Sequence, residues 1–282
     1  MRISRQDQVR MERAHVRAWP ALNTAVIDGW LWRASGGGSQ RANSVSTIDF
    51  TATDTAAAID AVEARYQEAA MPARFHTYDH TAPAGLANEL RDRGYTEAEA
   101  TLTMFKRLEP TTASPRVECR DVECRDVECR DVECRDVECR DVECRDGTWD
   151  EWCDVYLGAI SESRRTVNQE ILRAIPRPCA FFGNRHNGRI VSTALCVIGF
   201  GCAVTECVAT RAEARRSGGG RTVMAGVLSW AAHQDADMIG LQVAQANAPA
   251  VQLYQSLGFT EGATNRFWFR PNTAPRRPIC PG

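Results

Sequence analysis

The sequence predicts an α/β protein of the mixed α+β kind. Strand-like runs and segments with helical apolar spacing alternate along the chain, and a glycine-rich stretch joins a strand to a helix at Gly218–Gly220. The 282 residues, 44% of them hydrophobic, are enough to bury one large core or two modest ones. A short repeat in mid-chain separates two sets of elements. We therefore expect an N-terminal domain at 1–110, a linker at 111–146, a second domain at 147–272 and a tail at 273–282.

Charge and hydropathy exclude several classes of function. Lys and Arg number 34 against 36 Asp and Glu, so the chain lacks the overall positive charge that nucleic-acid binding favours. No stretch approaches the roughly 18–20 consecutive apolar residues of a membrane span. The charged opening of the chain also lacks the apolar segment of a signal peptide. We expect a cytoplasmic protein with neither nucleic acid nor membrane as a partner.

The repeat consists of six identical copies of Val-Glu-Cys-Arg-Asp between Val117 and Asp146. A five-residue period gives no apolar stripe on a helix and alternates faces on a strand, so the tract cannot build a core by itself. Its C-x4-C spacing differs from the C-x2-C pairs of zinc sites, and we expect no metal. We interpret one copy as native sequence entering the second domain and five as an acidic inserted linker. A metal-buffering or interaction tract is the alternative.

The elements before the repeat are a helix, a strand hairpin and a further run of helices and strands. The glycines at 36–38 join the two strands of the hairpin and precede no helix. The expected helices are 5–17, 53–69 and 84–93, and the expected strands are 25–34, 40–50, 73–78 and a closing strand at 101–108.

The elements after the repeat place a glycine loop between a strand and a helix. The expected helices are 148–159, 166–174, 221–234 and 248–257, and the expected strands are 180–184, 189–198, 203–209, 238–243 and 266–270.

The glycine loop Arg215-Arg216-Ser217-Gly218-Gly219-Gly220 predicts a phosphate site. The first N–H groups of a helix have no partner inside the helix, and the helix dipole favours negative charge there. The loop has neither the Walker lysine nor the G-x-G-x-x-G spacing, so nucleoside triphosphates and nicotinamide cofactors are disfavoured. A glycine turn serving only tight packing is the alternative.

A second group of residues follows this loop at Leu241-Gln242-Val243, Asn247, Leu253-Tyr254 and Leu257-Gly258-Phe259. Together with the loop it resembles the closing part of the GNAT superfamily of N-acetyltransferases. The resemblance extends over about 146–270 and implies a mixed, mostly antiparallel GNAT-type sheet flanked by helices. Within that sheet, the parallel strands at 203–209 and 238–243 are expected to splay apart and admit acetyl-CoA as the acetyl donor.

The resemblance also assigns a cofactor-binding set. Main-chain groups of the loop would hold the pyrophosphate, and the end of the preceding strand would pair with the pantetheine arm and polarise the thioester carbonyl. The residues so assigned are Val208, Thr210, Arg215, Arg216, Ser217, Gly218, Gly219, Gly220, Arg221 and Asn247. Two departures, Gly219 in place of an aliphatic residue and Ala212 in place of a proline, predict a looser loop.

Two residues are candidates for proton transfer. Tyr254 matches the tyrosine that often protonates the departing thiolate in the family, with simple aromatic packing as the alternative. Glu206 is the candidate general base, because strict alternation puts it on the same face of its strand as Val208. A salt-bridged structural carboxylate and deprotonation through water are the alternatives. The scattered cysteines, Cys202 and Cys207 among them, are expected to be reduced thiols without a nucleophilic role.

The N-terminal half resembles a degenerate GNAT-like unit without a pyrophosphate loop. We expect it to pack on the catalytic half and to wall the acceptor pocket, with Trp30, Arg41 and Asn43 as lining candidates. The resulting hypothesis is an acetyl-CoA-dependent N-acetyltransferase acting on a primary amine of a small molecule or peptide, as a monomer or homodimer. A non-catalytic acyl-CoA-binding or regulatory protein of the same fold is the alternative.

Overall fold

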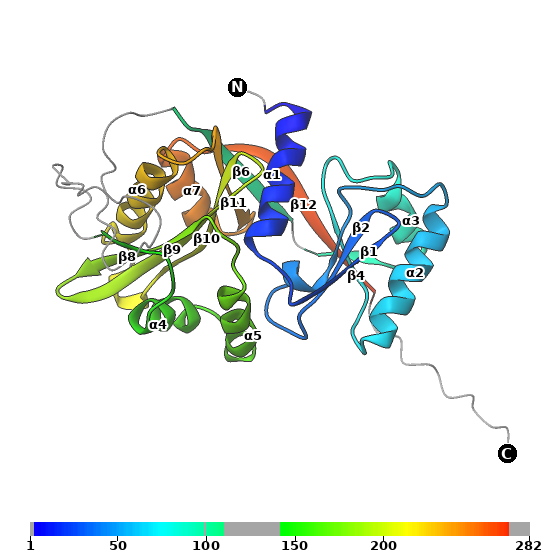
Figure 1. Cartoon of the computed structure of the whole chain (residues 1–282), viewed down its shortest axis with the longest axis horizontal. Helices are drawn as coiled ribbons and strands as arrows, with labels where there is room; N and C mark the ends of the chain where they lie inside the picture. Colours follow the sequence, from blue (N-terminus) through cyan, green and yellow to red (C-terminus); the bar gives the residue numbers. More distant parts are fainter. Residues whose placement is uncertain (1–2, 99, 110–141, 271–282) are drawn as a thin grey trace, which may run out of the picture.

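The computed structural model describes residues 3–98, 100–109 and 142–270. Its strands form one continuous sheet in the order β1-β2-β3-β4-β12-β6-β11-β10-β9-β8-β7, with β5 paired on β12. The pairing is antiparallel except at β3–β4 and β10–β11, so the expected mixed, mostly antiparallel sheet is confirmed. Figure 1 shows the two halves of this sheet on either side of helix α1. None of the helices in the described ranges is long and apolar enough to span a membrane.

The N-terminal half begins with α1 and then forms a small sheet covered on one face by α2 and α3 (Figure 1). Its core contains Trp30, Trp32, Tyr66 and Phe75, all buried. The elements are α1 Arg5–Ala18, β1 Asn23–Ile27, β2 Trp30–Ala34, the 3-10 helix η1 Arg41–Asn43, β3 Val45–Ser46, α2 Thr55–Glu68, β4 Arg74–Thr77, α3 Leu86–Asp92, β5 Thr96–Glu97 and β6 Thr101–Arg107.

Two sequence expectations in this half are corrected. The run 25–34 is not one strand, because Asp28 and Gly29 adopt positive φ angles of 52° and 90° and turn the chain between β1 and β2. The run 40–50 is mostly irregular, and only Val45–Ser46 forms a strand. Gly38 instead packs against Asn168 and Val167 of the C-terminal half.

The C-terminal half is a layered structure around β8 to β11. Helices α4, α5 and α1 pack on one face and α6 and α7 on the other. The elements are β7 Val142–Arg145, α4 Asp150–Gly158, α5 Glu162–Arg173, β8 Cys179–His186, β9 Arg189–Gly199, β10 Cys202–Thr210, the 3-10 helix η3 Ala212–Ala214, α6 Gly219–Ala231, β11 Met238–Ala244, α7 Ala248–Ser256 and β12 Thr260–Phe269.

The two halves exchange strands. β6 was expected to close the N-terminal unit, but it lies between β11 and β12, pairing Arg107 with Met238 and Phe105 with Thr260. In return, the end of β12 pairs with β4, where Trp268 lies opposite Phe75. Figure 1 shows β12 running from one half into the other. Each half of the sheet therefore contains a strand from the other half of the chain.

The last copy of the repeat forms strand β7. Val142 and Cys144 are buried on its inner face, while Glu143 binds Arg185 of β8 at 2.7 Å. The last copy therefore forms part of the C-terminal half, and its interpretation as the native copy stays a prediction. The other five copies, and the tail at 273–282, lie outside the described residues.

Candidate active site

The parallel pair β10–β11 separates halfway along its length. Pairing runs from Cys202 with Met238 to Thr205 with Leu241 and then stops, although both strands continue. Beyond Thr205, β10 stays paired only with β9. The sequence-predicted splay is therefore present, and the edge of β10 that faces β11 has no strand partner from Glu206 onward.

A β-bulge marks the point of separation. Glu206 lies opposite Leu195 and Ala209 opposite Thr193, so Cys207 and Val208 together face a single residue of β9. Cys207 has a positive φ of 56°, and its carbonyl accepts a hydrogen bond from Thr193. The bulge breaks the alternation of the strand. The expectation that Glu206 and Val208 share a face is wrong, since Glu206 meets residues of α1 and η1 while Val208 packs in the layer of α6 and α7.

The glycine loop ends at the start of α6, as predicted. In the described part of the chain, the first main-chain bond of this turn runs from Thr222 N to Gly218 O at 3.0 Å, and the N–H groups of 216–221 donate none. Arg216 and Gly218 have φ angles of 62° and 89°, which turn the loop before the helix. The side chains of Arg215, Arg216 and Arg221 are exposed around it. Unpartnered donors, a helix N-terminus and three cations together fit a phosphate group.

Gly219 is required by its surroundings. A Cβ at this position would overlap Ser192 Oγ of β9 and lie 3.4 Å from Asn184 Nδ2 of β8. Ser192 Oγ is itself bonded to Thr210 Oγ1 at 3.0 Å, which ties the loop to the end of β10. Gly219, where the family often has an aliphatic residue, therefore lets the first turn of α6 pack closely against the sheet.

Tyr254 lies on α7 in the layer beneath the splayed strands, with its ring 6.0 Å from that of Phe259. Burial raises the pKa of its hydroxyl to about 12, and the negative charge of Glu206 adds to the effect. The hydroxyl is therefore protonated at neutral pH, as a proton donor must be. Asn247 caps the same helix, accepting a bond from Ala250 N at 3.4 Å. Its predicted contact with the cofactor stays a prediction.

Glu206 is buried and held by the N-terminal half. Arg41 of η1 donates from Nη1 to Oε1 and from Nη2 to Oε2, each at 2.5 Å. His15 Nδ1 of α1 lies 3.7 Å from the same carboxylate. Although burial alone would raise the pKa of Glu206, the charge and hydrogen bonds of Arg41 outweigh it and lower the pKa to about 2.

A second buried carboxylate, Glu12, was missed by sequence reasoning. It accepts bonds from Thr103 at 3.1 Å, Gln242 at 3.3 Å and Asn265 at 3.5 Å. Burial raises the pKa of Glu12 to about 8, so it carries a proton at neutral pH. Gln242 also accepts from Arg41 at 3.4 Å and so connects Glu12 to the Glu206 pair. The signal in the sequence was an acidic residue on the apolar face of the first helix, beside Met11 and His15.

The other lining candidates are placed apart from the splay. Trp30 is buried in the N-terminal core, where Nε1 donates to Ala82 O at 2.7 Å. The amide of Asn43 donates to the carbonyls of Gly37 and Ser39 and so fixes the N-terminal glycine segment 36–38. Only Arg41 of the three reaches a predicted site residue. The described residues contain no group of three or more His, Cys, Asp or Glu side chains suited to a metal ion.

Comparison with known families and proteins agrees with this geometry. Residues 146–259 match the family described as "Acetyltransferase (GNAT) family". Residues 7–120 match the family described as "Probable histone acetyltransferase Rv0428c C-terminal". Over 261 residues the chain is 28% identical to "Uncharacterized N-acetyltransferase YobR" of Bacillus subtilis (strain 168), covering 90% of this chain and 95% of that protein.

Solved structures share the whole two-part arrangement. A GCN5-related N-acetyltransferase from Kribbella flavida aligns with a TM-score of 0.62 at 15% identity, over 93% of this chain and 95% of that one. A tandem GNAT protein from the clavulanic acid biosynthesis pathway aligns with a TM-score of 0.56 at 12% identity, over 94% of this chain and 95% of that one. At these identities the likeness concerns the fold alone.

Proposed function

This chain belongs to the GNAT superfamily of acetyltransferases, and we propose that it transfers an acetyl group from acetyl-CoA directly to a primary amine of a small molecule or peptide. The single observation that carries the proposal is the splay of β10 from β11 beside the unpartnered N–H groups of 216–221. A pantetheine-like arm can pair with the free edge of a strand, and a pyrophosphate can accept from the donors at the helix start.

The proposed binding residues follow from this arrangement. Main-chain N–H groups of the loop from Arg216 to Arg221 bind the pyrophosphate, and Arg215 adds positive charge at its rim. Main-chain groups of Val208 and Thr210 bind the pantetheine arm along the free edge of β10. Acetyl-CoA supplies an acetyl group activated as a thioester. A main-chain N–H at the bulge, near Val208, stabilises the negative charge that develops on the thioester oxygen.

Tyr254 is proposed as the general acid. In the balanced reaction the amine nitrogen forms a bond to the acetyl carbon, the carbon–sulfur bond breaks, and the thiolate takes a proton from the tyrosine hydroxyl. The nitrogen loses one proton, and a proton returned through water restores the tyrosine hydroxyl. The position of the hydroxyl beneath the splayed strands and its protonation at neutral pH support this role, while the raised pKa of about 12 makes it a weak acid that needs its proton returned in each cycle.

The amine proton can leave to Glu206 or to water. The bidentate bond from Arg41 and a pKa of about 2 make Glu206 a weak proton acceptor. We therefore favour loss of the proton through water, with Glu206 held in its ion pair with Arg41. Burial keeps the pKa of the Cys207 thiol well above its usual range, so this nearby thiol stays protonated and weakly nucleophilic.

The test is amine-dependent release of free thiol from acetyl-CoA, measured with pools of primary amines and peptides. Mass spectrometry of the acetylated amine distinguishes turnover from reaction with the protein's own cysteines. Tyr254→Phe should lower kcat by about a hundredfold or more and leave acetyl-CoA affinity unchanged. Tyr95→Phe is the matched control, because it removes a hydroxyl that binds Glu63 in the N-terminal half, away from the splay.

The outcomes separate the two functions. Calorimetric binding of acetyl-CoA without product from any pool would replace the proposal with the non-catalytic acyl-CoA-binding alternative. Absence of both binding and turnover would contradict both functions. Turnover that survives Tyr254→Phe would leave the acetyltransferase in place and remove the acid role from Tyr254.

A further inference from the structure

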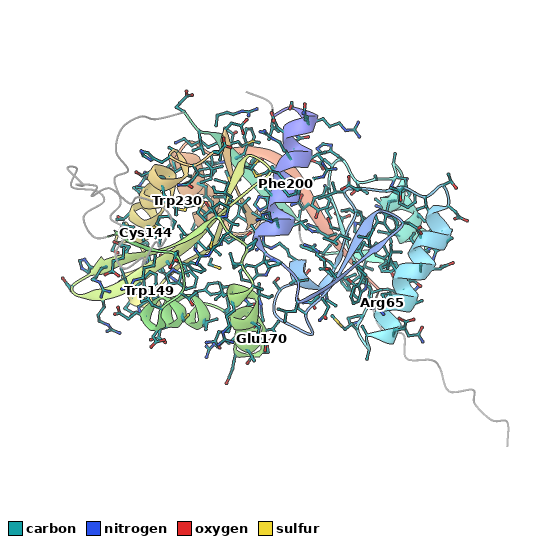
Figure 2. All side chains as sticks on the ribbon, in the orientation of Figure 1. Arg65, Cys144, Trp149, Glu170, Phe200 and Trp230 are labelled. Atoms are coloured by element: carbon teal, nitrogen blue, oxygen red, sulfur yellow. The ribbon has the colours of Figure 1, made fainter. Side chains whose placement is uncertain are left out.

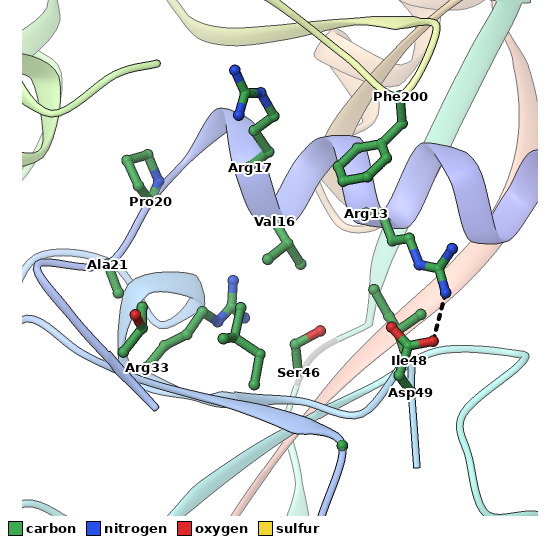
Figure 3. A pocket seen from close by; sticks show the side chains of 13 residues that line it. Arg13, Val16, Arg17, Pro20, Ala21, Arg33, Ser46, Ile48, Asp49 and Phe200 are labelled. Carbon is green, nitrogen blue, oxygen red and sulfur yellow. Dashed lines mark hydrogen bonds and ion pairs between the residues drawn. The ribbon is translucent and has the colours of Figure 1, made fainter. Parts of the chain in front are cut away.

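A cavity of about 530 Å³ lies between α1 and the sheet of the N-terminal half. Its walls come from α1, β1, β2 and the segment after β3, and Phe200 covers one side from the β9–β10 turn (Figures 2 and 3). The residues that line it are Arg13, Val16, Arg17, Pro20, Ala21, Thr24, Gly29, Leu31, Arg33, Ser46, Ile48, Asp49 and Phe200.

This cavity is separate from the candidate active site. At 100° per residue, Arg13 and Val16 lie on the face of α1 roughly opposite Met11, which packs on the C-terminal half, and Arg17 lies at the border between the two faces. Phe200 precedes β10, whereas the bulge lies near its other end. The helix and most of the length of β10 thus stand between the cavity and the splay.

Arg33 is the notable group in the wall. Its side chain extends from β2 toward α1 (Figure 3), and only 2% of the residue is exposed. It donates to Ser44 O at 2.9 Å and Ser44 Oγ at 3.2 Å, and it lies 3.4 Å from His76 Nδ1. No carboxylate of the described residues pairs with it. Since a buried guanidinium is costly without a counter-ion, this cavity is poised for an anion.

The rest of the lining adds positive charge and apolar surface. Arg13 is neutralised by Asp49 at 2.6 Å, as Figure 3 shows. Arg17 donates to Arg177 O at 2.8 Å and pairs with no described carboxylate. The walls are otherwise mainly apolar, with Val16, Pro20, Ala21, Leu31, Ile48 and Phe200. This combination excludes the protonated amine of an acetyl acceptor, which the two uncompensated arginines would repel.

We propose that the cavity binds a small organic carboxylate with an apolar body, whose carboxylate pairs with Arg33 and whose body packs against Val16, Leu31 and Ile48. A guanidinium binds a carboxylate through two parallel hydrogen bonds, which fixes the orientation of the ligand. The volume lies within the usual range of roughly 300–1,000 Å³ for small-molecule sites. This site is independent of acetyl transfer and does not rest on the proposed function.

The test measures binding of the probe 4-(4-fluorophenyl)butyrate to the full chain. Binding is monitored by the fluorine NMR line width of the probe. The primary amide of the same acid has the same shape without the charge. The carboxylate should show saturable line broadening, and the amide should bind at least about tenfold more weakly.

Two cavity variants and one control complete the design. Arg33→Met should weaken binding of the carboxylate about tenfold or more, and Val16→Trp should weaken it by narrowing the cavity while keeping Arg33. Arg65→Met, on α2 at the far side of this half (Figure 2), should bind like the wild type. Val16→Trp decides the question if Arg33→Met does not fold.

Three results would overturn the proposal. They are no saturable broadening up to the solubility limit of the probe, equal binding of the amide, and unchanged binding in Val16→Trp. Because none of these measurements involves acetyl-CoA or turnover, the test is independent of the proposed enzymatic activity.

Discussion

Arg41 of the N-terminal half binds both carboxylate oxygens of Glu206 on the splayed strand of the C-terminal half, each at 2.5 Å. The contact joins two residues 165 positions apart in the sequence. It sets the ionisation of the carboxylate and holds η1 against the bulge of β10. The N-terminal half, which has no glycine loop at a helix start, therefore contributes a charged side chain to the candidate active site.

Replacing Arg41 by Met should destabilise the protein by roughly 2–4 kcal/mol, because it leaves the buried Glu206 without its counter-ion. The measurement is the free energy of unfolding in urea near neutral pH. The double variant Arg41→Met with Glu206→Gln should recover part of the loss, since it removes the unpaired charge as well. A double variant no more stable than Arg41→Met would show that the pair contributes through packing instead.

Glu12 predicts an unusual pH dependence of stability. Its pKa is about 8 in the folded protein and near 4.5 when unfolded, so the folded state binds the additional proton between these values. Stability from this group is complete below about pH 4.5 and is lost as the pH rises toward 8, with a slope of about 1.4 kcal/mol per pH unit.

Glu12→Gln should remove that slope. The quantity to measure is the difference in unfolding free energy between the variant and the wild type at several pH values between about 5 and 8. Glu68→Gln is the control, since Glu68 is an exposed carboxylate on α2. A difference that does not change with pH would mean that Glu12 ionises normally in the folded protein.

Gly219→Ala should destabilise the protein and weaken acetyl-CoA binding, because the added methyl group overlaps Ser192 Oγ. Adding Ser192→Ala should rescue both, since Ser192 Cβ would be 3.6 Å from the new carbon, an ordinary contact. Gly147→Ala is the matched control, with open space around its Cβ. Thermal unfolding and calorimetric titration with acetyl-CoA provide the two readouts. Equal behaviour of the 219 and 147 variants would contradict the packing role.

The strand order limits how far the repeat can be shortened. β6 and β7 are five strand positions apart, and Arg107 and Val142 lie at opposite ends of the intervening strands. At ordinary strand dimensions their ends are roughly 30 Å apart. Deleting 117–141 leaves nine residues between Arg107 and Val142, which reach about 33–36 Å when fully extended and so have little slack.

A five-copy deletion should therefore lower the melting temperature, because the remaining residues must run almost fully extended to join β6 to β7. Deletion of 127–141 leaves nineteen residues and should keep the wild-type melting temperature. Equal melting of both deletions would show that the shortened linker joins the two strands at no cost to stability.

Local patterns allowed much of the C-terminal half to be predicted. The glycine loop, the strand before it and the helices after it depend on neighbouring residues, and the structure has them in the expected order. The Asp28-Gly29 turn was missed because an apolar run on both sides hid the hairpin signal. The exchange of β6 and β12 could not be predicted from the sequence. The pairing of Phe105 with Thr260 joins residues 155 positions apart and does not depend on local propensity.

Contacts between distant parts of the sequence also explain why the surroundings of Glu206 could not be predicted. Alternation along a strand predicts a face only until a bulge, and the single extra residue at Cys207 reversed the relationship between Glu206 and Val208. The partner of Glu206 came from the other half of the chain. Its role as a base stays a prediction, and the bond from Arg41 makes Glu206 a weak proton acceptor.

The strand exchange has a consequence for biosynthesis. A ribosome releases the N-terminus first, yet the N-terminal sheet lacks the partner of β4 until residues 266–269 have left the exit tunnel. Until then the edge of β4 exposes unpaired main-chain groups, which can pair with the edges of other chains. The nascent protein must carry this open edge while residues 78–265 are synthesised, and both halves close together only once β12 has emerged.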